Sequence, residues 1–144
     1  MDTSTAVLLQ GLVKKEGRSL LQYVSESYPW TPRKSHEAVS AIIAMAHEER
    51  DAAASLVRHL VSHRVQPPYL GAYPMSFTTI NYMSVDFLVP QLVEFEKKRI
   101  AELEKDVLAT SDEEAKHLLQ HLLQMKRQHL TTLTSLAATQ KPAA

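Results

Sequence analysis

Four ionisable residues interrupt apolar series that are otherwise suited to a protein core. Glu16, Glu49, Glu96 and His129 each fall between apolar residues that repeat at steps of three or four. A carboxylate buried alone is unfavourable unless a metal ion, a counter-ion or a proton accompanies it. Carboxylates and imidazoles projecting into a helix bundle can also hold metal ions. The four residues are therefore candidate ligands of one metal site.

Helical spacing of apolar residues runs through most of the chain and predicts the elements that position these side chains. The helices are expected at about residues 3–27, 35–64, 76–108 and 111–137. The first predicted helix ends before two prolines. The third helix is expected to kink at Pro90 and to have Tyr82 on its inward side. A capping box over Ser111–Glu114 begins the fourth helix. The predicted fold is an all-α four-helix bundle over residues 1–137, with a flexible tail over 138–144.

The connection between the second and third predicted helices, residues 65–75, is long and rich in proline. At roughly 3.1 Å per residue in a polyproline conformation it can reach on the order of 35 Å. The helix before it is about 40 Å long at 1.5 Å per residue. The connection can therefore cross the bundle and leave the second and third helices parallel. A folded-over loop in an up-and-down bundle is the alternative.

Over about residues 5–137 the chain resembles the ferritin-like superfamily, rubrerythrin and bacterioferritin relatives included. In such bundles two helices supply one Glu each and the other two supply Glu-x-x-His. Glu16 and Glu96 match the single glutamates, Glu49 matches the glutamate of the second helix, and His129 matches the histidine of the fourth. The resemblance implies a ferritin-like four-helix bundle with a long crossover between helices two and three, and a carboxylate-bridged di-iron site.

Two positions depart from the family pattern. Ala52 stands where the histidine of the second helix is expected, and Lys126 stands where the glutamate of the fourth helix is expected. A charged ammonium does not ligate a metal, but it can neutralise neighbouring carboxylates. We therefore expect a vestigial or reduced metal site, with either no cofactor or iron, in a structural or partner-binding protein.

A second interpretation of the sequence is that the site still binds iron. Here the chain is an iron-binding oxidoreductase or iron-handling protein, in which the remaining glutamates and His129 hold iron and Tyr23 or Tyr82 traps a radical. If the helical phase differs from the one assumed, Glu94 and Asp51 are the expected substitutes for the buried carboxylates.

Two His-x-x-x-His pairs, His59 with His63 and His117 with His121, each share one helical face. Imidazoles at this spacing suit zinc or nickel, so a zinc-dependent DinB-like bundle enzyme is a further alternative, if the pairs meet from two helices or two subunits. The simpler interpretation is that these pairs are solvated positions beside the apolar stripe. The run from His47 to Asp51 lacks the second histidine of a zinc-protease motif.

Composition excludes several classes of protein. The 144 residues contain 16 basic and 16 acidic side chains, so bulk charge does not favour a nucleic-acid partner. The absence of cysteine excludes disulfides, thiolate catalysis and iron–sulfur clusters. We recognise no secretion signal and no membrane-spanning run, so the expected location is the cytoplasm. We also expect a homodimer through a helix face, with Trp30 closing one end of the core.

Overall fold

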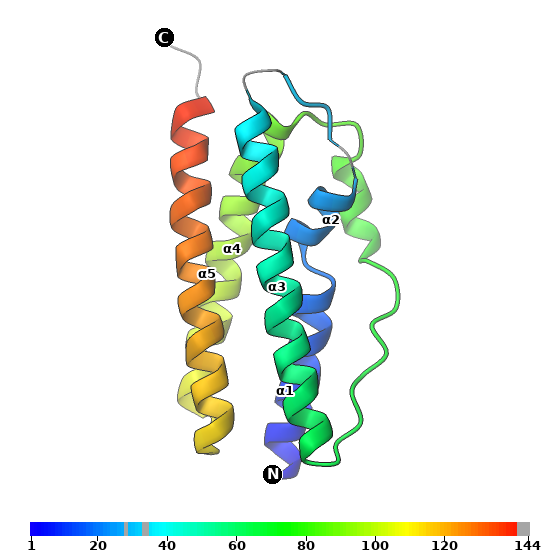
Figure 1. The fold of residues 1–144 in the computed structure, drawn as a ribbon, viewed down its shortest axis with the longest axis vertical. Helices are drawn as coiled ribbons and strands as arrows, with labels where there is room; N and C mark the ends of the chain where they lie inside the picture. The colour runs from blue at the N-terminus through cyan, green and yellow to red at the C-terminus, as the bar shows by residue number, and fades with distance from the viewer. Residues whose placement is uncertain (28, 33–34, 141–144) are drawn as a thin grey trace.

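The computed structural model describes residues 1–27, 29–32 and 35–140. Its helices are α1 (Thr3–Gly17), α2 (Leu20–Glu26), α3 (His36–Ser62), the 3₁₀ helix η2 (Met75–Ile80), α4 (Val85–Ala109) and α5 (Glu113–Gln140). The described part of the chain contains no strand, only an isolated bridge between Trp30 and Ser84. The all-α helical bundle predicted from the sequence is therefore confirmed (Figure 1).

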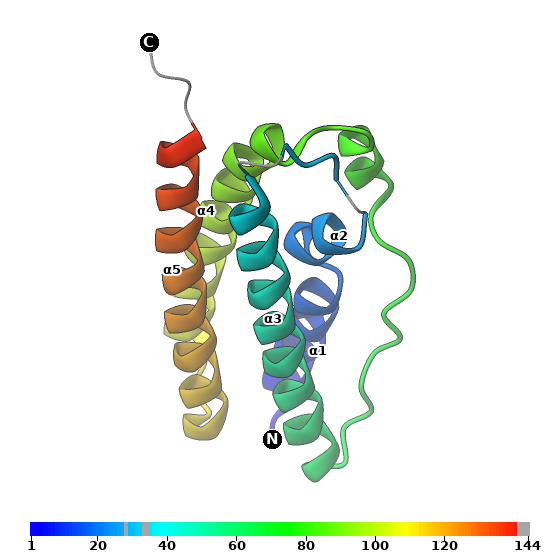
Figure 2. The ribbon, with the colours of Figure 1, turned by 45° about the horizontal axis from the view of Figure 1, so that its top comes forward.

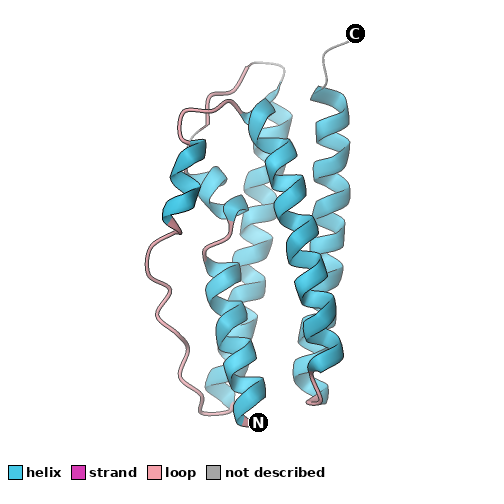
Figure 3. Cartoon of the chain, turned by 180° about the vertical axis from the view of Figure 1, so that it is seen from behind, coloured by secondary structure: helices cyan, strands magenta, loops and turns pink. Residues whose placement is uncertain are grey.

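The long helices form a bundle in which α3 and α4 point the same way. α1 and α2 run up the molecule in Figure 1, α3 and α4 run down it, and α5 runs up again. The segment after α3 returns along the length of the bundle, on the side away from α5 (Figure 2 and Figure 3). Residues 65–75 therefore lie mostly in a crossover connection, which is the arrangement that their length and proline content favour over a folded-over loop.

The first predicted helix is divided into two. α1 ends at Gly17, Arg18 has the non-helical angles φ −136° and ψ 45°, and Ser19 caps α2 by accepting a hydrogen bond from the Gln22 amide at 3.2 Å. The expectation of one helix over 3–27 is wrong here. The physical reason is that Ser19 offers the backbone a cap in place of a continued helix, while Arg18 turns toward the crossover.

The third predicted helix begins later than expected, at Val85 rather than near residue 76. Tyr82 has a left-handed φ of 70°, which a helix cannot contain, and its side chain is 102% exposed. Its predicted inward orientation is therefore wrong. Trp30 is also mostly exposed at 67%, so its ring does not close the core, although its carbonyl accepts a hydrogen bond from the Val85 amide.

Helix ends elsewhere are close to those predicted. α4 continues through Pro90. The cap of α5 is Asp112, whose carboxylate accepts from the Ala115 amide at 2.9 Å, and not Ser111 as the predicted capping box required. α5 extends to Gln140 and so includes residues 138–140, whereas the rest of the predicted tail, 141–144, lies outside the described residues.

The apolar core consists of two clusters at different levels of the bundle. One joins α2, the first half of α3, the start of α4 and Leu133 of α5. The other joins α1, the second half of α3, the end of α4 and the first half of α5. In α3, α4 and α5 a buried ionisable residue lies in the sequence between the contributions of that helix to the two clusters, and Glu16 lies between the contribution of α1 to one cluster and that of α2 to the other. This places a polar level between the two apolar ones.

Candidate functional site: a buried lysine among three glutamates

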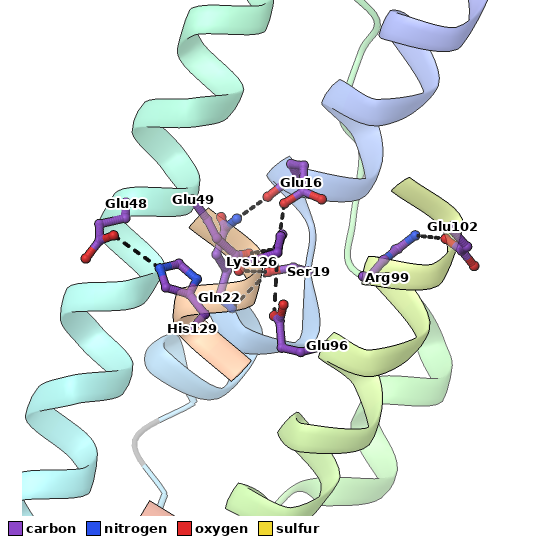
Figure 4. A network of polar contacts seen from close by, with 10 residues as sticks. All are labelled: Glu16, Ser19, Gln22, Glu48, Glu49, Glu96, Arg99, Glu102, Lys126 and His129. Carbon is purple, nitrogen blue, oxygen red and sulfur yellow. Dashed lines mark hydrogen bonds and ion pairs between the residues drawn. The ribbon is translucent and has the colours of Figure 1, made fainter. Parts of the chain in front are cut away.

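Four helices each place one charged side chain at the polar level of the bundle. Glu16 comes from α1, Glu49 from α3, Glu96 from α4 and Lys126 from α5, and none is more than 1% exposed. Figure 4 shows the four side chains directed toward one another. The sequence spacing had placed the three glutamates on the inward faces of their helices, and the structure brings them together.

The Lys126 ammonium lies between the three carboxylates. Its Nζ is 2.7 Å from an oxygen of Glu16, 3.0 Å from one of Glu49 and 3.7 Å from one of Glu96 (Figure 4). The contact with Glu49 is also a well-formed hydrogen bond. A single cationic atom thus has three acidic neighbours on three different helices.

The break between α1 and α2 supplies a further partner for this cluster. Ser19 Oγ donates to Glu49 Oε1 at 2.9 Å, and Gln22 Nε2 donates to the main-chain carbonyl of Glu16. Our reading of the sequence missed both residues. A signal was present, because Ser19-Leu20-Leu21-Gln22 has the Ser-x-x-Gln spacing of a helix start before an apolar run.

Glu96 is the carboxylate with the fewest contacts in the cluster. Neither of its oxygens accepts a hydrogen bond from any described residue, and its ion-pair contact with Lys126 is 3.7 Å long. Burial raises the pKa of Glu96 above its ordinary value, the Lys126 charge opposes this, and the negative charge of Glu16 adds to it. Protonation of this carboxyl group is therefore favoured by its surroundings.

Burial also raises the pKa of Glu49, to about 7, against the opposing charge of Lys126 and with the support of Glu16 and Glu96. For Lys126 burial by itself lowers the pKa, but the three carboxylates raise it above the ordinary value of a lysine. The ammonium thus keeps its proton at neutral pH, while the carboxylates in excess over it tend to take one up.

His129 is buried but pairs away from the cluster. Its Nε2 lies 3.2 Å from an oxygen of Glu48, a side chain that is 55% exposed, and its Nδ1 has no hydrogen-bond partner among the described residues. Burial lowers the pKa of His129 more than the hydrogen bond to Glu48 raises it. The neutral imidazole therefore links α5 to the outer edge of α3.

Where the family pattern places a histidine, Ala52 lines a groove of about 410 Å³ between α3 and α5. The proposed substitutes Asp51 and Glu94 are exposed. The donor set does not fit a two-metal centre, because an ammonium lies among the carboxylates and one nitrogen ligand is missing.

A different group of side chains has ligand atoms close enough together to share an ion. His59, His63 and Glu114 each offer one ligand atom, and these three atoms lie within 4.8 Å of one another. Among the described residues, the buried glutamates form no such group, and His117 and His121 do not join the first histidine pair. The two pairs therefore do not meet within one chain.

Comparison of the chain with protein-family models, with curated proteins and with solved structures finds no match. Within the described ranges, no helix combines the length and the apolar character that crossing a membrane requires.

Proposed function

We propose that this chain is a ferritin-like helical bundle in which the Lys126 ammonium takes the place of a metal cation, and that it acts as a structural or partner-binding protein. The single observation that supports this most is the position of Nζ, 2.7 Å from Glu16 and 3.0 Å from Glu49. This ammonium attracts the buried carboxylates as a bound metal would, with a single positive charge. The raised pKa values of Glu49 and Glu96 favour protonation, which offsets part of the remaining negative charge without iron.

The order of the helices supports the ferritin-like assignment. A bundle with one long crossover between parallel second and third helices is the arrangement of ferritin-like folds. Here α3 and α4 are parallel and joined by such a crossover (Figure 1). Four of the six ligand positions of the family pattern are kept, as Glu16, Glu49, Glu96 and His129, whereas Lys126 and Ala52 occupy the other two.

Exposed aromatic residues support a role in binding a partner. Trp30 and Tyr82, 67% and 102% exposed, line an open pocket of about 840 Å³ next to Tyr23 and Tyr73. Aromatic side chains at the surface are enriched where proteins bind one another. The homodimer expected from the sequence stays a prediction, and analytical ultracentrifugation of the wild type measures it.

Restoring the missing ligands tests the proposal. The double variant Ala52→His, Lys126→Glu removes the cation and supplies both side chains of the family pattern. Anaerobic titration with ferrous iron should give stoichiometric binding in this variant and none in the wild type. Ala52→His alone is the matched control and should stay without iron, because the ammonium is still present.

Iron bound stoichiometrically by the wild type, and lost in Glu96→Gln, would overturn the proposal and support the second candidate, an iron-handling protein. The oxygens of Glu96 and the Nδ1 of His129 have no hydrogen-bond partner among the described residues, and this favours that candidate. If the double variant folds, as judged by its circular dichroism, but binds no iron, the assumed correspondence with the ferritin-like ligand positions is wrong.

A further inference from the structure

We propose that His59, His63 and Glu114 form a zinc site at the surface of the bundle, separate from the buried cluster. His59 and His63 lie one turn apart near the end of α3, and Glu114 lies in the first turn of α5. The site would therefore join two helices whose ends meet at one end of the molecule. It is independent of the role proposed above for Lys126.

The distances between the ligand atoms suit a tetrahedral ion. His63 Nε2 is 3.3 Å from Glu114 Oε2. Ligands about 2.0 Å from a tetrahedral zinc ion are about 3.3 Å apart, so this pair already has the required separation. The third ligand atom, from His59, lies within 4.8 Å of the other two. In a tetrahedral site this atom would lie about 3.3 Å from each of the other two.

The two imidazoles are held in position before any ion binds. Their ring centroids are 4.6 Å apart with an interplanar angle of 61°. His59 is half-buried, and its Nε2 is shielded from solvent without a hydrogen-bond partner among the described residues. Buried polar nitrogens normally have a hydrogen-bond partner or a bound ion, so contact with an ion or a water molecule would stabilise His59 Nε2.

The chemistry of the donors selects the class of ion. Two imidazole nitrogens and one carboxylate oxygen are preferred by Zn²⁺ and neighbouring divalent transition metals over Mg²⁺ or Ca²⁺, which prefer oxygen ligands. Three protein ligands leave a fourth position for water or for a donor from another molecule.

Titration with ZnCl₂ tests the site. Protein stripped with a chelator is titrated in competition with a chromophoric zinc indicator, and one equivalent should bind. His63→Gln and Glu114→Gln should each weaken zinc binding at least about tenfold, because each removes a side chain that coordinates the ion directly. Even the loss of a residue that only hydrogen-bonds to a ligand weakens metal binding by tenfold or more. Both side chains are exposed enough for the variants to fold.

The second histidine pair provides the matched control. His117 and His121 are exposed and share the same spacing on α5, so His117→Gln removes one imidazole without touching the site. Its zinc affinity should equal that of the wild type. Zinc should also raise the thermal midpoint of the wild type and of Lys126→Met, but not that of His63→Gln, because the ion links α3 to α5.

Absence of zinc binding at up to 100 µM, or binding unchanged in His63→Gln and Glu114→Gln, would refute the site. Binding lost in His117→Gln instead would assign the zinc to the other pair. Neither result affects the proposal for the buried cluster, because that proposal is tested with iron and with variants at Ala52 and Lys126.

Discussion

Lys126 is a fully buried charge whose neighbours depend on it. Removing one partner of a buried ion pair leaves the others unpaired in a medium that solvates them poorly. The sequence predicted the buried glutamates well, because a single ionisable residue in an apolar helical series is easy to detect. The sequence left open whether the Lys126 ammonium points into the bundle, since a long side chain can also extend to solvent.

Lys126→Met should lower the free energy of unfolding by about 3–5 kcal/mol at pH 7, the usual loss when a buried ion pair is broken. Urea denaturation followed by circular dichroism measures it. Arg127→Met is the control, because the Arg127 contact with Glu104 is about half exposed and should contribute at most about 1 kcal/mol. A loss for Lys126→Met no larger than that of the control would contradict a central role for the ammonium.

Glu49 should make the stability of the protein depend on pH. Its pKa is about 7 in the folded protein and 4.5 for an ordinary glutamate, so the folded state binds the proton more tightly. The resulting stabilisation is full below pH 4.5 and is lost as the pH rises to about 7. The slope between these limits is about 1.4 kcal/mol per pH unit for one proton.

Glu49→Gln should remove that contribution, so the difference in stability between wild type and variant should change between pH 5 and pH 7 and be constant above pH 8. Urea denaturation at each pH measures the difference. The exposed Glu94→Gln serves as control. His129 acts in the opposite direction, since its lowered pKa means that stability is lost as the pH falls below 6.5, and comparison of variant with wild type cancels its effect.

At the scale of the elements, the break between α1 and α2 and the crossover depend on each other. Arg18 Nε donates to the Gly71 carbonyl at 2.8 Å, and its guanidinium lies over the Tyr73 ring at 5.2 Å. A Cβ on Gly17 would come within 2.9 Å of the Leu70 side chain, so only glycine permits this approach without a shift. The local signal for the break is the Ser-x-x-Gln spacing at Ser19, whereas these contacts between distant segments leave no periodic signal in the sequence.

Arg18→Ala should loosen the crossover without unfolding the bundle. The loss of a hydrogen bond and of a cation–π contact predicts a decrease of about 1–2 kcal/mol in the free energy of unfolding. Hydrogen exchange should also become faster for the amides of residues 69–73. In the control Arg58→Ala, whose guanidinium contacts Ser55 on its own helix, exchange in that segment should be unchanged. Equal exchange in both variants would show that Arg18 does not hold the crossover.

For the whole molecule, the crossover joins two halves that share both apolar clusters. α1, α2 and α3 precede it, α4 and α5 follow it, and each cluster includes residues from both halves. The sequence favoured this topology over a folded-over loop, because residues 65–75 are long and proline-rich enough to span the bundle. It did not predict the exposed Trp30 and Tyr82, since the left-handed backbone at Tyr82 depends on how the crossover enters α4.

Cutting the crossover should therefore leave the molecule assembled. With a specific protease site inserted between Pro68 and Tyr69, cleavage should yield two fragments that elute together at the position of the intact protein in size-exclusion chromatography. The helices on the two sides continue to bury their shared core after the cut. A chain with the same insertion but no protease added is the control, and separation of the fragments would contradict a core shared in this way.

The counter-ion of the buried glutamates is a side chain of the protein itself, so the cluster does not depend on a supply of metal ion. A protein that folds around a dissociable ion gains stability only in proportion to the logarithm of the free ion concentration around it. The ammonium of Lys126 is covalently attached, so every copy of the chain carries this cation from synthesis onward. Lack of metal ions or the presence of a chelator does not remove it. The same attachment means that this cation is never exchanged, delivered or stored.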